Sequence, residues 1–418
     1  MPKHYAVLVD NQSQIEQLAI QIQKGNYAEH FGSITLKRGA IFSNTEIERF
    51  IWEEEQHDIR ELASKRLQPL RSLSSGERKK ALLEHVLNLN PDFLILVNPF
   101  DNLDIAFQKE LRQKLHEISK SIELVQLLNR TEDLLPNTDI LFTFSNGTFS
   151  RLTGIEAFKA ISKNNHSHTL EAIPKPLHEN DFMLDGKLVE FKEIMVSYDQ
   201  KCVLNGITWT IKRNEFWQLL GPNGSGKTTL LNLITGDNHK GYGQDLTLFG
   251  RKKGSGESVW DIKEHIGYFT PSMIDQFKGY HSAIQMLVSG LHDSVGLYQE
   301  PTDGELRLAK SWLKVLQLQQ KKDTQFRELS QGEKRLIMLA RAMVKHPPLL
   351  ILDEPTAGLD DTNAKFFVGL VNKIAQESRT TIVFVSHRKE PGLHPKMIYV
   401  LEASSSGSIG KILSNTHL

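Results

Sequence analysis

A glycine-rich stretch constrains the fold of this 418-residue chain more than any other feature. It reads Gly221-Pro-Asn-Gly-Ser-Gly-Lys227-Thr228, which fits the spacing GxxxxGK[ST]. An apolar run, Phe216–Leu220, precedes it, and the run from Thr229 to Ile234 has the composition of a helix. A strand, a glycine loop and a helix in this order bring backbone N–H groups and a helix N-terminus around a phosphate. We therefore expect a phosphate-binding loop here, rather than a turn that matches by chance.

Two side chains of the loop have separate expected roles. Lys227 is expected to reach the β- and γ-phosphates of a nucleotide, and the Thr228 hydroxyl to bind Mg²⁺. Tyr198 lies upstream at the end of an alternating run, where an aromatic ring can stack on adenine. Its alternative role is packing at a strand end. The residues expected to contact ATP in this half are Tyr198, Gly221, Pro222, Asn223, Gly224, Ser225, Gly226, Lys227, Thr228 and Thr229.

Two further apolar runs end in polar residues. Leu349–Leu352 is followed by Asp353-Glu354, and Thr381–Val385 by Ser386-His387. Such runs are typical of buried parallel strands, whose carboxyl ends face the ligand in α/β sheets. Asp353 is expected to bind Mg²⁺, Glu354 to orient or polarise the attacking water, and His387 to hydrogen-bond the γ-phosphate and that water.

The chain contains an internal repeat. Leu73-Ser-Ser-Gly-Glu77 resembles Leu329-Ser-Gln-Gly-Glu333, and each is followed by a basic and then an apolar helical stretch. Leu73 and Asp104 are separated by the same number of positions as Leu329 and Asp360. Equal spacing between matching motifs indicates two copies of one structural unit.

The repeat shows what the first half lacks. Val97-Asn98 stands where the second half has Asp353-Glu354, so both carboxylates are absent. Asn129 stands where the second half has His387. The first half is also short, which predicts the loss of most of a nucleotide-side subdomain. It ends in a predicted hairpin, Ile140–Leu152, whose turn is Asn-Gly.

The stretch Asp10–Leu18 is a weaker copy of the phosphate loop. Asn11 and Ser13 match its Asn and Ser, whereas Ile15 and Glu16 stand where its Lys and Thr would. Without glycines the backbone cannot easily wrap a phosphate, and Glu16 would repel one. An unrelated strand and helix is an equal alternative for this stretch.

Composition limits the classes of function. Lys+Arg and Asp+Glu are both 50, so no global charge favours nucleic acid or an acidic membrane. Cys202 is the single cysteine, which fits a reducing compartment, and no apolar run reaches the length of a membrane span. We expect a soluble, cytoplasmic protein. The basic turn Gly250–Gly256 and the pair His166 and His168 are interpreted as solvated loops rather than anion or metal sites.

Together these motifs resemble an ABC-type ATPase cassette, and the first half resembles a second, degenerate cassette. The run Asp245–Tyr268 resembles more narrowly the ModF-type tandem ABC ATPases, named for the molybdate transport operon and also described as photorepair proteins. Two departures stand out. The first cassette of that family normally keeps a phosphate loop and an Asp-Glu pair. The glutamine that many cassettes carry after Ile-Gly-Tyr is missing here, where Thr270-Pro-Ser272 follows Phe269 and Gln276 is the nearest glutamine.

The resemblance implies an α/β, P-loop fold of ABC type with two tandem cassettes, the N-terminal one shortened and degenerate. The expected boundaries are 1–154 for the degenerate cassette, 155–186 for a linker and 187–418 for the complete cassette. ABC cassettes pair head to tail, so one composite ATP site would combine the second-half residues with Ser74 and Gly76. The other would pair the degenerate loop with Ser330 and Gly332, and is expected to be inactive.

Three functions follow as alternatives. The first is a soluble ATPase using ATP and Mg²⁺, linked to molybdate transport or regulation, with an unidentified protein partner such as a membrane permease. The second is a tandem ABC protein acting on ribosomes or nucleic acid, which the short linker and degenerate cassette disfavour. The third is a nucleotide switch without hydrolysis, which Glu354 and His387 disfavour. The two halves are expected to pair within one chain or in a homodimer.

Overall fold

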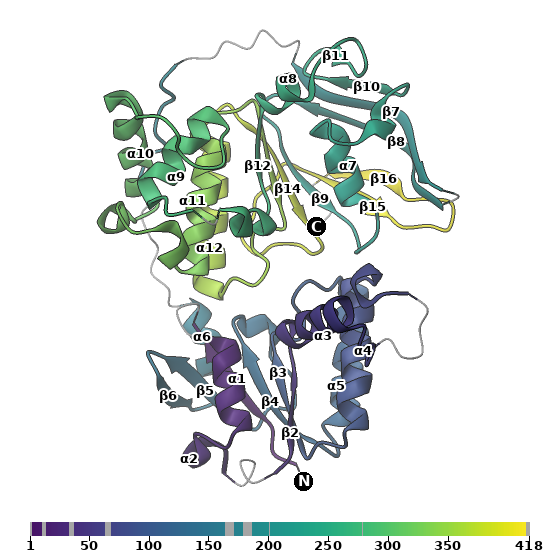
Figure 1. The fold of residues 1–418 in the computed structure, drawn as a ribbon, viewed down its shortest axis with the longest axis vertical. Helices are drawn as coiled ribbons and strands as arrows, with labels where there is room; N and C mark the ends of the chain where they lie inside the picture. The colour runs from purple at the N-terminus through teal and green to yellow at the C-terminus, as the bar shows by residue number, and fades with distance from the viewer. Residues whose placement is uncertain are drawn as a thin grey trace. The chain divides into compact units, whose positions relative to one another are not determined.

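The computed structural model describes residues 2–10, 14–32, 37–62, 68–163, 171–178, 186–199, 201–277 and 279–414 (Figure 1). The chain divides into two compact units. One comprises Met1–Ser167 with Gly358–Ala364, and the other His168–Ala357 with Lys365–Leu418. The first unit thus extends beyond residue 154 to include helix α6, Ile155–Lys163, whose Phe158 is fully buried. The expected linker histidines, His166 and His168, lie outside the described residues.

The first unit is built on a six-stranded sheet. Its strand order is β2-β3-β4-β1-β5-β6, and every neighbouring pair is parallel except β5 and β6. Apolar runs of four to six residues form the central strands because both faces are covered. The strands are β1 (Tyr5–Val9), β2 (Gly39–Phe42), β3 (Phe93–Val97), β4 (Glu123–Leu128), β5 (Ile140–Ser145) and β6 (Thr148–Leu152).

The helices of the first unit lie on both faces of this sheet (Figure 1). They are α1 (Ile15–Gln23), α2 (Ala28–Phe31), α3 (Asn44–His57), α4 (Ser75–Asn88), α5 (Ile105–Ile118) and α6. The predicted hairpin is confirmed, with Asn146 and Gly147 at φ values of 50° and 77° in the turn between β5 and β6. A turn with positive φ at both central residues matches the twist of the two strands.

The second unit repeats the same sheet. Its order is β12-β13-β14-β9-β15-β16, again parallel except for the last pair. The strands are β9 (Phe216–Leu220), β12 (Ile266–Phe269), β13 (Leu349–Asp353), β14 (Thr381–Ser386), β15 (Met397–Glu402) and β16 (Ile409–Ser414). Identical order and direction establish two tandem α/β cassettes. In this scheme β1 and α1 occupy the positions of β9 and α7 (Lys227–Ile234), so Asp10–Leu18 follows the strand that is equivalent to β9.

The other helices of the second unit are α8 (Val259–Lys263), α9 (Ala283–Ser289), α10 (Asp303–Val315), α11 (Gln331–Met343) and α12 (Asp361–Glu377). None of the helices in the described part of the chain is both long and apolar enough to cross a bilayer.

The two units differ in a second sheet. The second unit has an antiparallel sheet in the order β11-β10-β7-β8, formed by β7 (Lys187–Tyr198), β8 (Lys201–Lys212), β10 (Asp245–Leu248) and β11 (Arg251–Lys252). It shares one buried apolar cluster with Leu230 and Leu233 of α7. Within the described residues of the first unit no such sheet is present.

The first unit presents a different surface at the corresponding place on α1. Gln14, Gln17 and Gln21 line an open cleft of about 290 Å³ together with Tyr27 and Phe144. The two rings lie 6.3 Å apart, edge to face, and both contact Phe149. Within the described residues, this part of α1 therefore borders an open cleft, whereas α7 packs against a second sheet.

The basic turn after β10 differs from the sequence expectation. Arg251 and Lys252 are exposed, but the side chain of Lys253 is fully buried. Its Nζ lies 3.4 Å from a carboxylate oxygen of Glu257 and 4.7 Å from the ring centroid of Tyr242. A buried ammonium needs such partners, and these come from chain segments that fold over the turn. The solvated-loop interpretation is therefore wrong for Lys253.

Candidate active site

The glycine loop connects β9 to α7, as its spacing predicts. Gly224 and Gly226 have φ values of 76° and 88°, in the left-handed region that glycine adopts without strain. A Cβ at Gly226 would lie 2.7 Å from Leu204 Cδ2, and one at Gly221 would lie 2.6 Å from the hydroxyl of Ser225. The loop thus needs glycine for both backbone conformation and space.

Two polar side chains of the loop point inward. The Lys227 ammonium donates to the carbonyl oxygens of Gly221 at 2.7 Å and Pro222 at 3.1 Å, so it lies along the loop. The Ser225 hydroxyl is fully buried and has no hydrogen-bond partner within the described part of the chain. Thr228 is exposed at the first turn of α7. These groups form a cradle with a positive charge and a helix N-terminus, which is the environment that polyphosphates bind.

Asp353 and Glu354 lie at the carboxyl end of β13. Burial, and then the adjacent charge of Glu354, raise the pKa of Asp353 to about 6. Burial also raises the pKa of Glu354, but His387 and the charge of Lys227 outweigh it, so that pKa is lowered overall. Two neighbouring carboxylates beside one lysine leave an excess of negative charge, which a divalent cation would neutralise.

The backbone fixes how Glu354 is presented. Its φ is 48°, and its N–H donates to the carbonyl oxygen of Val385 at 2.9 Å. A non-glycine residue at positive φ is uncommon and often marks a functional position. His387 Nδ1 lies 3.7 Å from a Glu354 carboxylate oxygen. The two residues come from neighbouring strands, so the sheet brings together the pair that the sequence predicts.

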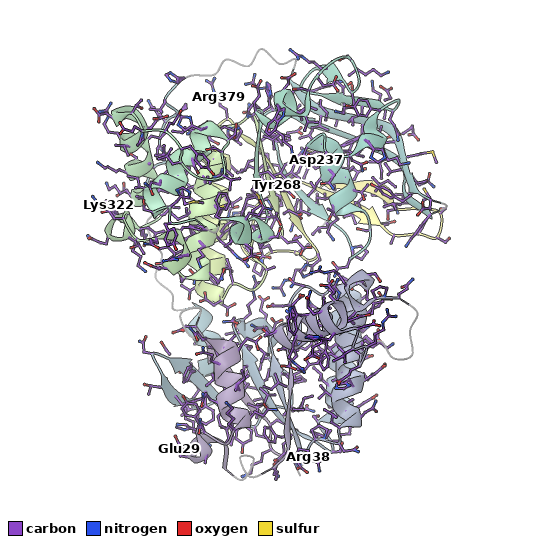
Figure 2. All side chains as sticks on the ribbon, in the orientation of Figure 1. Glu29, Arg38, Asp237, Tyr268, Lys322 and Arg379 are labelled. Atoms are coloured by element: carbon purple, nitrogen blue, oxygen red, sulfur yellow. The ribbon has the colours of Figure 1, made fainter. Side chains whose placement is uncertain are left out.

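One contact of Asp353 was not anticipated from the sequence. The hydroxyl of Tyr268, on β12, donates to Asp353 Oδ2 at 3.4 Å, and the residue lies inside the second unit (Figure 2). Tyr268 pairs with Ile351 across β12 and β13, which carries its ring towards the strand end. The signal in the sequence was the position of Tyr268 just before the missing glutamine. Gln276, the nearest glutamine, is exposed at the end of a short 3-10 turn, Pro271–Gln276.

Tyr198 lies at the end of β7 with 39% of its surface exposed. Its hydroxyl accepts a hydrogen bond from the buried Asn238 side chain at 2.8 Å. The contact holds the hydroxyl end of the ring and leaves the residue partly exposed, as stacking on a planar base would require. Asn238 was missed because it lies far from Tyr198 in sequence.

The two signature segments have the same local structure. Ser74 and Ser330 cap α4 and α11 in capping boxes with Glu77 and Glu333, at nearly equal backbone angles. Gly76 and Gly332 are both buried in the first turn. The next turn repeats a further contact, because Lys79 Nζ donates to Pro99 O at 2.9 Å and an Arg335 N–H donates to Pro355 O at 2.8 Å.

The first half has a neutral pair at its strand ends. Asn98 N–H donates to Leu127 O at 2.9 Å with φ at 41°, which copies the backbone of Glu354. Its side chain exchanges two hydrogen bonds with Asn129. Glu16 lies in the first turn of α1, where burial raises its pKa. Asn11 and Ser13 lie outside the described residues.

The donor set in the second half fits a metal held partly by its substrate. No cluster of three or more His, Cys, Asp or Glu side chains in the described ranges is arranged to hold a metal by itself. Mg²⁺ commonly takes one or two protein ligands and completes its shell with phosphates and water. Asp353 and Thr228 would supply such ligands beside the phosphate cradle.

Comparison with known proteins agrees with this geometry. Residues 204–357 match the family model described as ABC transporter. The chain is 38% identical over 328 residues to the ABC transporter ATP-binding protein ModF of Escherichia coli, a match covering 76% of this chain and 67% of that protein. It is 29% identical over 324 residues to an uncharacterized ABC transporter ATP-binding protein of Schizosaccharomyces pombe, covering 76% and 66%. The match thus spans about two thirds of each relative's length.

One solved structure is similar in fold over nearly the whole chain. It is described as a model of ribosome-bound archaeal Pelota and ABCE1, and aligns with a TM-score of 0.68 over 99% of this chain and 75% of that one. The sequence identity is 14%, so this likeness concerns the fold alone. The family match, the repeated sheet and the ATP-site residues of the second half lead to one conclusion: the chain belongs to the ModF-like tandem ABC ATPases.

Proposed function

We propose that this protein hydrolyses Mg-ATP at one composite site, formed by the phosphate loop of the second half and the signature of the first. The observation that carries the proposal is the contrast between two pairs. Glu354 and His387 lie 3.7 Å apart beside Lys227 and Asp353, whereas Asn98 and Asn129 bond to each other. Only the first pair contains a carboxylate and an imidazole, the groups that can polarise an attacking water.

Each second-half residue has a distinct role in this proposal. Lys227 would neutralise charge on the β- and γ-phosphates, and Thr228 and Asp353 would hold Mg²⁺. Mg²⁺ supplies electrostatic stabilisation of the transferring phosphoryl group. Glu354 would orient the water for in-line attack, while His387 holds that water and the γ-phosphate. Tyr198 would stack on adenine, and Gly221 to Thr229 would surround the phosphates.

Ser74 and Gly76 of the first half would complete the site. The first half cannot bind phosphate in the same way, because Ile15 and Glu16 replace the lysine and threonine. The second signature, with Ser330 and Gly332, would then face no working phosphate loop. In this proposal one ATP is turned over per cycle, and the halves pair within one chain or between two copies.

A single-turnover ATPase measurement tests the composite site. Gly76→Asp places a carboxylate in the signature, while Gly76→Ala controls for packing, because any Cβ there would lie 2.8 Å from the Phe107 ring. We expect turnover to fall far more with aspartate than with alanine. Equal turnover in the two variants would contradict the use of this signature. A matching loss in Gly332→Asp would assign the site to two copies of the chain.

The biological partner is a separate part of the proposal. We propose a cytoplasmic role, in line with the single cysteine, in transport or regulation related to molybdate, on the ground of likeness to ModF. A pulldown with Glu354→Gln, which should hold ATP without hydrolysis, identifies the partner. Recovery of a membrane permease supports this role, and recovery of ribosomes or nucleic-acid proteins supports the alternative instead.

A further inference from the structure

Side chains of α4 and α5 donate hydrogen bonds to the loops that follow β3 and β4 in the first unit, and each such set of contacts is called a tie below. Lys79, on α4, is 2% exposed, and its ammonium donates to Pro99 O at 2.9 Å and Asp101 O at 2.7 Å. Ser75, beside it on α4, donates its hydroxyl to Asn102 O at 2.8 Å. The signature helix is therefore attached directly to the loop after β3.

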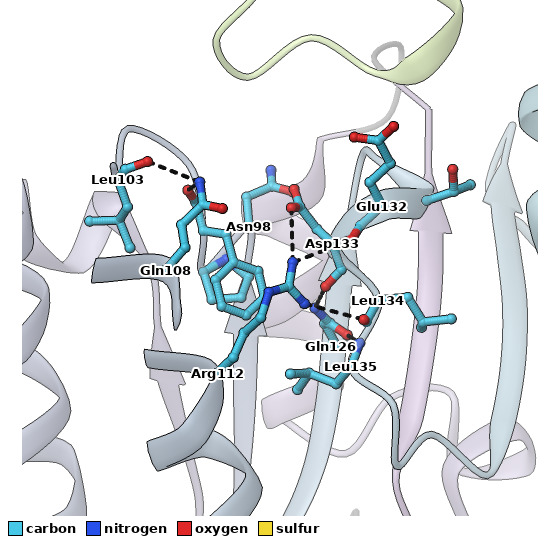
Figure 3. Close-up of polar contacts among 12 residues, drawn as sticks. Asn98, Leu103, Gln108, Arg112, Gln126, Glu132, Asp133, Leu134 and Leu135 are labelled. Atoms are coloured by element: carbon cyan, nitrogen blue, oxygen red, sulfur yellow. Dashed lines mark hydrogen bonds and ion pairs between the residues drawn. The ribbon is translucent and has the colours of Figure 1, made fainter. Parts of the chain in front are cut away.

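A second tie comes from α5. The amide of Gln108 donates to Leu103 O at 2.9 Å and to Phe100 O at 3.3 Å (Figure 3). Together, Lys79 and Gln108 bind the carbonyl oxygens of four residues of one short loop, 99–101 and 103. Loop carbonyls without such partners would need water or a ligand.

A third tie holds the loop after β4. The Arg112 guanidinium lies 4.0 Å from the ring centroid of Phe100 and donates to Leu134 O and Glu132 O at 3.3 Å (Figure 3). It also lies 3.5 Å from the buried carboxylate of Asp133. Arg112 thus connects the loops after both strands, which are the loops that would carry catalytic groups in a working cassette.

The second half carries different side chains at the positions of these three residues. The register of the repeat places Arg335, Ala364 and Val368 at the positions of Lys79, Gln108 and Arg112. Arg335 keeps the contact to the loop through Pro355 O. Alanine and valine have no side-chain donor, so the second and third ties cannot form there.

We propose that Lys79, Gln108 and Arg112 are positioning residues that hold the first-half signature and its adjoining loops in a fixed arrangement without bound nucleotide. The first half would then present a preformed signature. The use of that signature rests on the proposed composite site. The preformed arrangement itself does not.

Amide hydrogen exchange in the nucleotide-free full chain tests the arrangement. We expect the amides of 100–103 to exchange at least about fivefold more slowly in wild type than in Gln108→Ala, since a net hydrogen bond contributes roughly 1 kcal/mol. Equal exchange at 100–103 in wild type and Gln108→Ala would overturn the proposal.

Enzyme kinetics tests the functional part. Lys79→Met should lower kcat several-fold with little change in KM for ATP, and Lys79→Arg should restore it, since arginine serves at the equivalent position 335. Lys80→Met, at the exposed neighbouring lysine, is the matched control. Faster amide exchange at 100–103 in Lys79→Met, together with an unchanged kcat, would refute the role in catalysis. The composite site is judged separately, by comparing Gly76→Asp with Gly76→Ala.

Discussion

Asn98 and Asn129 exchange two hydrogen bonds across the ends of neighbouring strands. Asn98 Nδ2 donates to Asn129 Oδ1 at 2.5 Å, and the Asn129 backbone N–H donates to Asn98 Oδ1 at 3.0 Å. Asn129 Nδ2 also donates to Val9 O at 2.9 Å, which adds β1 to the link. The pair occupies the place of Glu354 and His387, so where the second half has the proposed catalytic pair, the first half has two hydrogen-bonded asparagines.

This replacement predicts that activity depends on one half. Glu354→Gln should lower kcat by roughly 10²–10⁴-fold, the usual contribution of an acid or base, while ATP binding persists. Asn98→Asp, at the equivalent position, should leave ATP turnover per folded molecule within about twofold. Single-turnover hydrolysis and nucleotide binding measure both effects. A large loss of turnover in Asn98→Asp with unchanged stability would show a catalytic role that we do not expect.

The Tyr268 contact predicts a pH-dependent effect on metal use. The pKa of Asp353 is about 6 because of burial and Glu354, and the Tyr268 hydrogen bond holds it lower than it would otherwise be. In Tyr268→Phe that pKa should rise, so Asp353 is protonated at higher pH and binds Mg²⁺ less well.

Magnesium titrations of ATPase activity at pH 6.5 and pH 8 measure this effect. The variant should need more Mg²⁺ than wild type at the lower pH, and the difference should shrink at the higher pH. Equal Mg²⁺ requirements at both values would show that the hydroxyl does not influence Asp353.

Lys79 predicts the dependence of stability on pH. Burial lowers its pKa to about 8, whereas an unfolded lysine titrates near 10.4. Between these values the unfolded state binds more protons, so this residue makes the free energy of unfolding rise as pH increases from 8 to about 10.4. Below pH 8 the lysine is protonated in both states, so this gain in the free energy of unfolding, on the order of a few kcal/mol in full, is absent.

The difference between wild type and Lys79→Arg isolates this contribution, because arginine stays charged throughout. Urea unfolding at pH 8, 9 and 10 should show a steeper increase in wild type. Lys80→Arg serves as the control at an exposed position. Parallel pH curves for wild type and Lys79→Arg would mean that Lys79 titrates normally.

The phosphate loop predicts a loss of both stability and binding. Gly226→Ala forces a Cβ at positive φ to within 2.7 Å of Leu204, which should cost roughly 1–3 kcal/mol and distort the loop. Gly243→Ala, also at positive φ but with no atom near its Cβ, is the matched control for backbone strain alone. The melting temperature should be lower, and ATP binding weaker, in Gly226→Ala than in Gly243→Ala.

The ring and the hydroxyl of Tyr198 should contribute differently to ATP affinity. Tyr198→Phe keeps the face for stacking and loses only the bond from Asn238, so ATP affinity should fall less than about threefold. Tyr198→Ala removes the ring and should weaken ATP binding by roughly tenfold. Fluorescent-nucleotide titration measures both, and equal affinity in the two variants would assign Tyr198 a packing role.

The sequence predicts those parts of the site that depend on order along the chain. The glycine loop, Asp353-Glu354 and His387 each follow an apolar run, and the parallel sheet places their strand ends together. The absence of the two carboxylates from the first half could also be predicted, because the repeat keeps its register.

Contacts between elements could not be read in this way. Tyr268 meets Asp353 only because β12 and β13 are neighbours, an order that the chain sequence does not specify. Lys253 resembled a solvated residue because its neighbours are Lys and Gly, while its partner Tyr242 comes from another segment. Burial of a charge is decided by what folds over it, and composition does not reveal that.

The cleft lined by Gln14, Gln17 and Gln21 bears on whether the first half could bind a nucleotide. Recovering nucleotide binding would require glycines and a lysine before α1, carboxylate and histidine at the two asparagines, and a new sheet over Gln14, Gln17 and Gln21. If the first half presents only its signature, as we propose, a return of nucleotide binding would require many residues to change together.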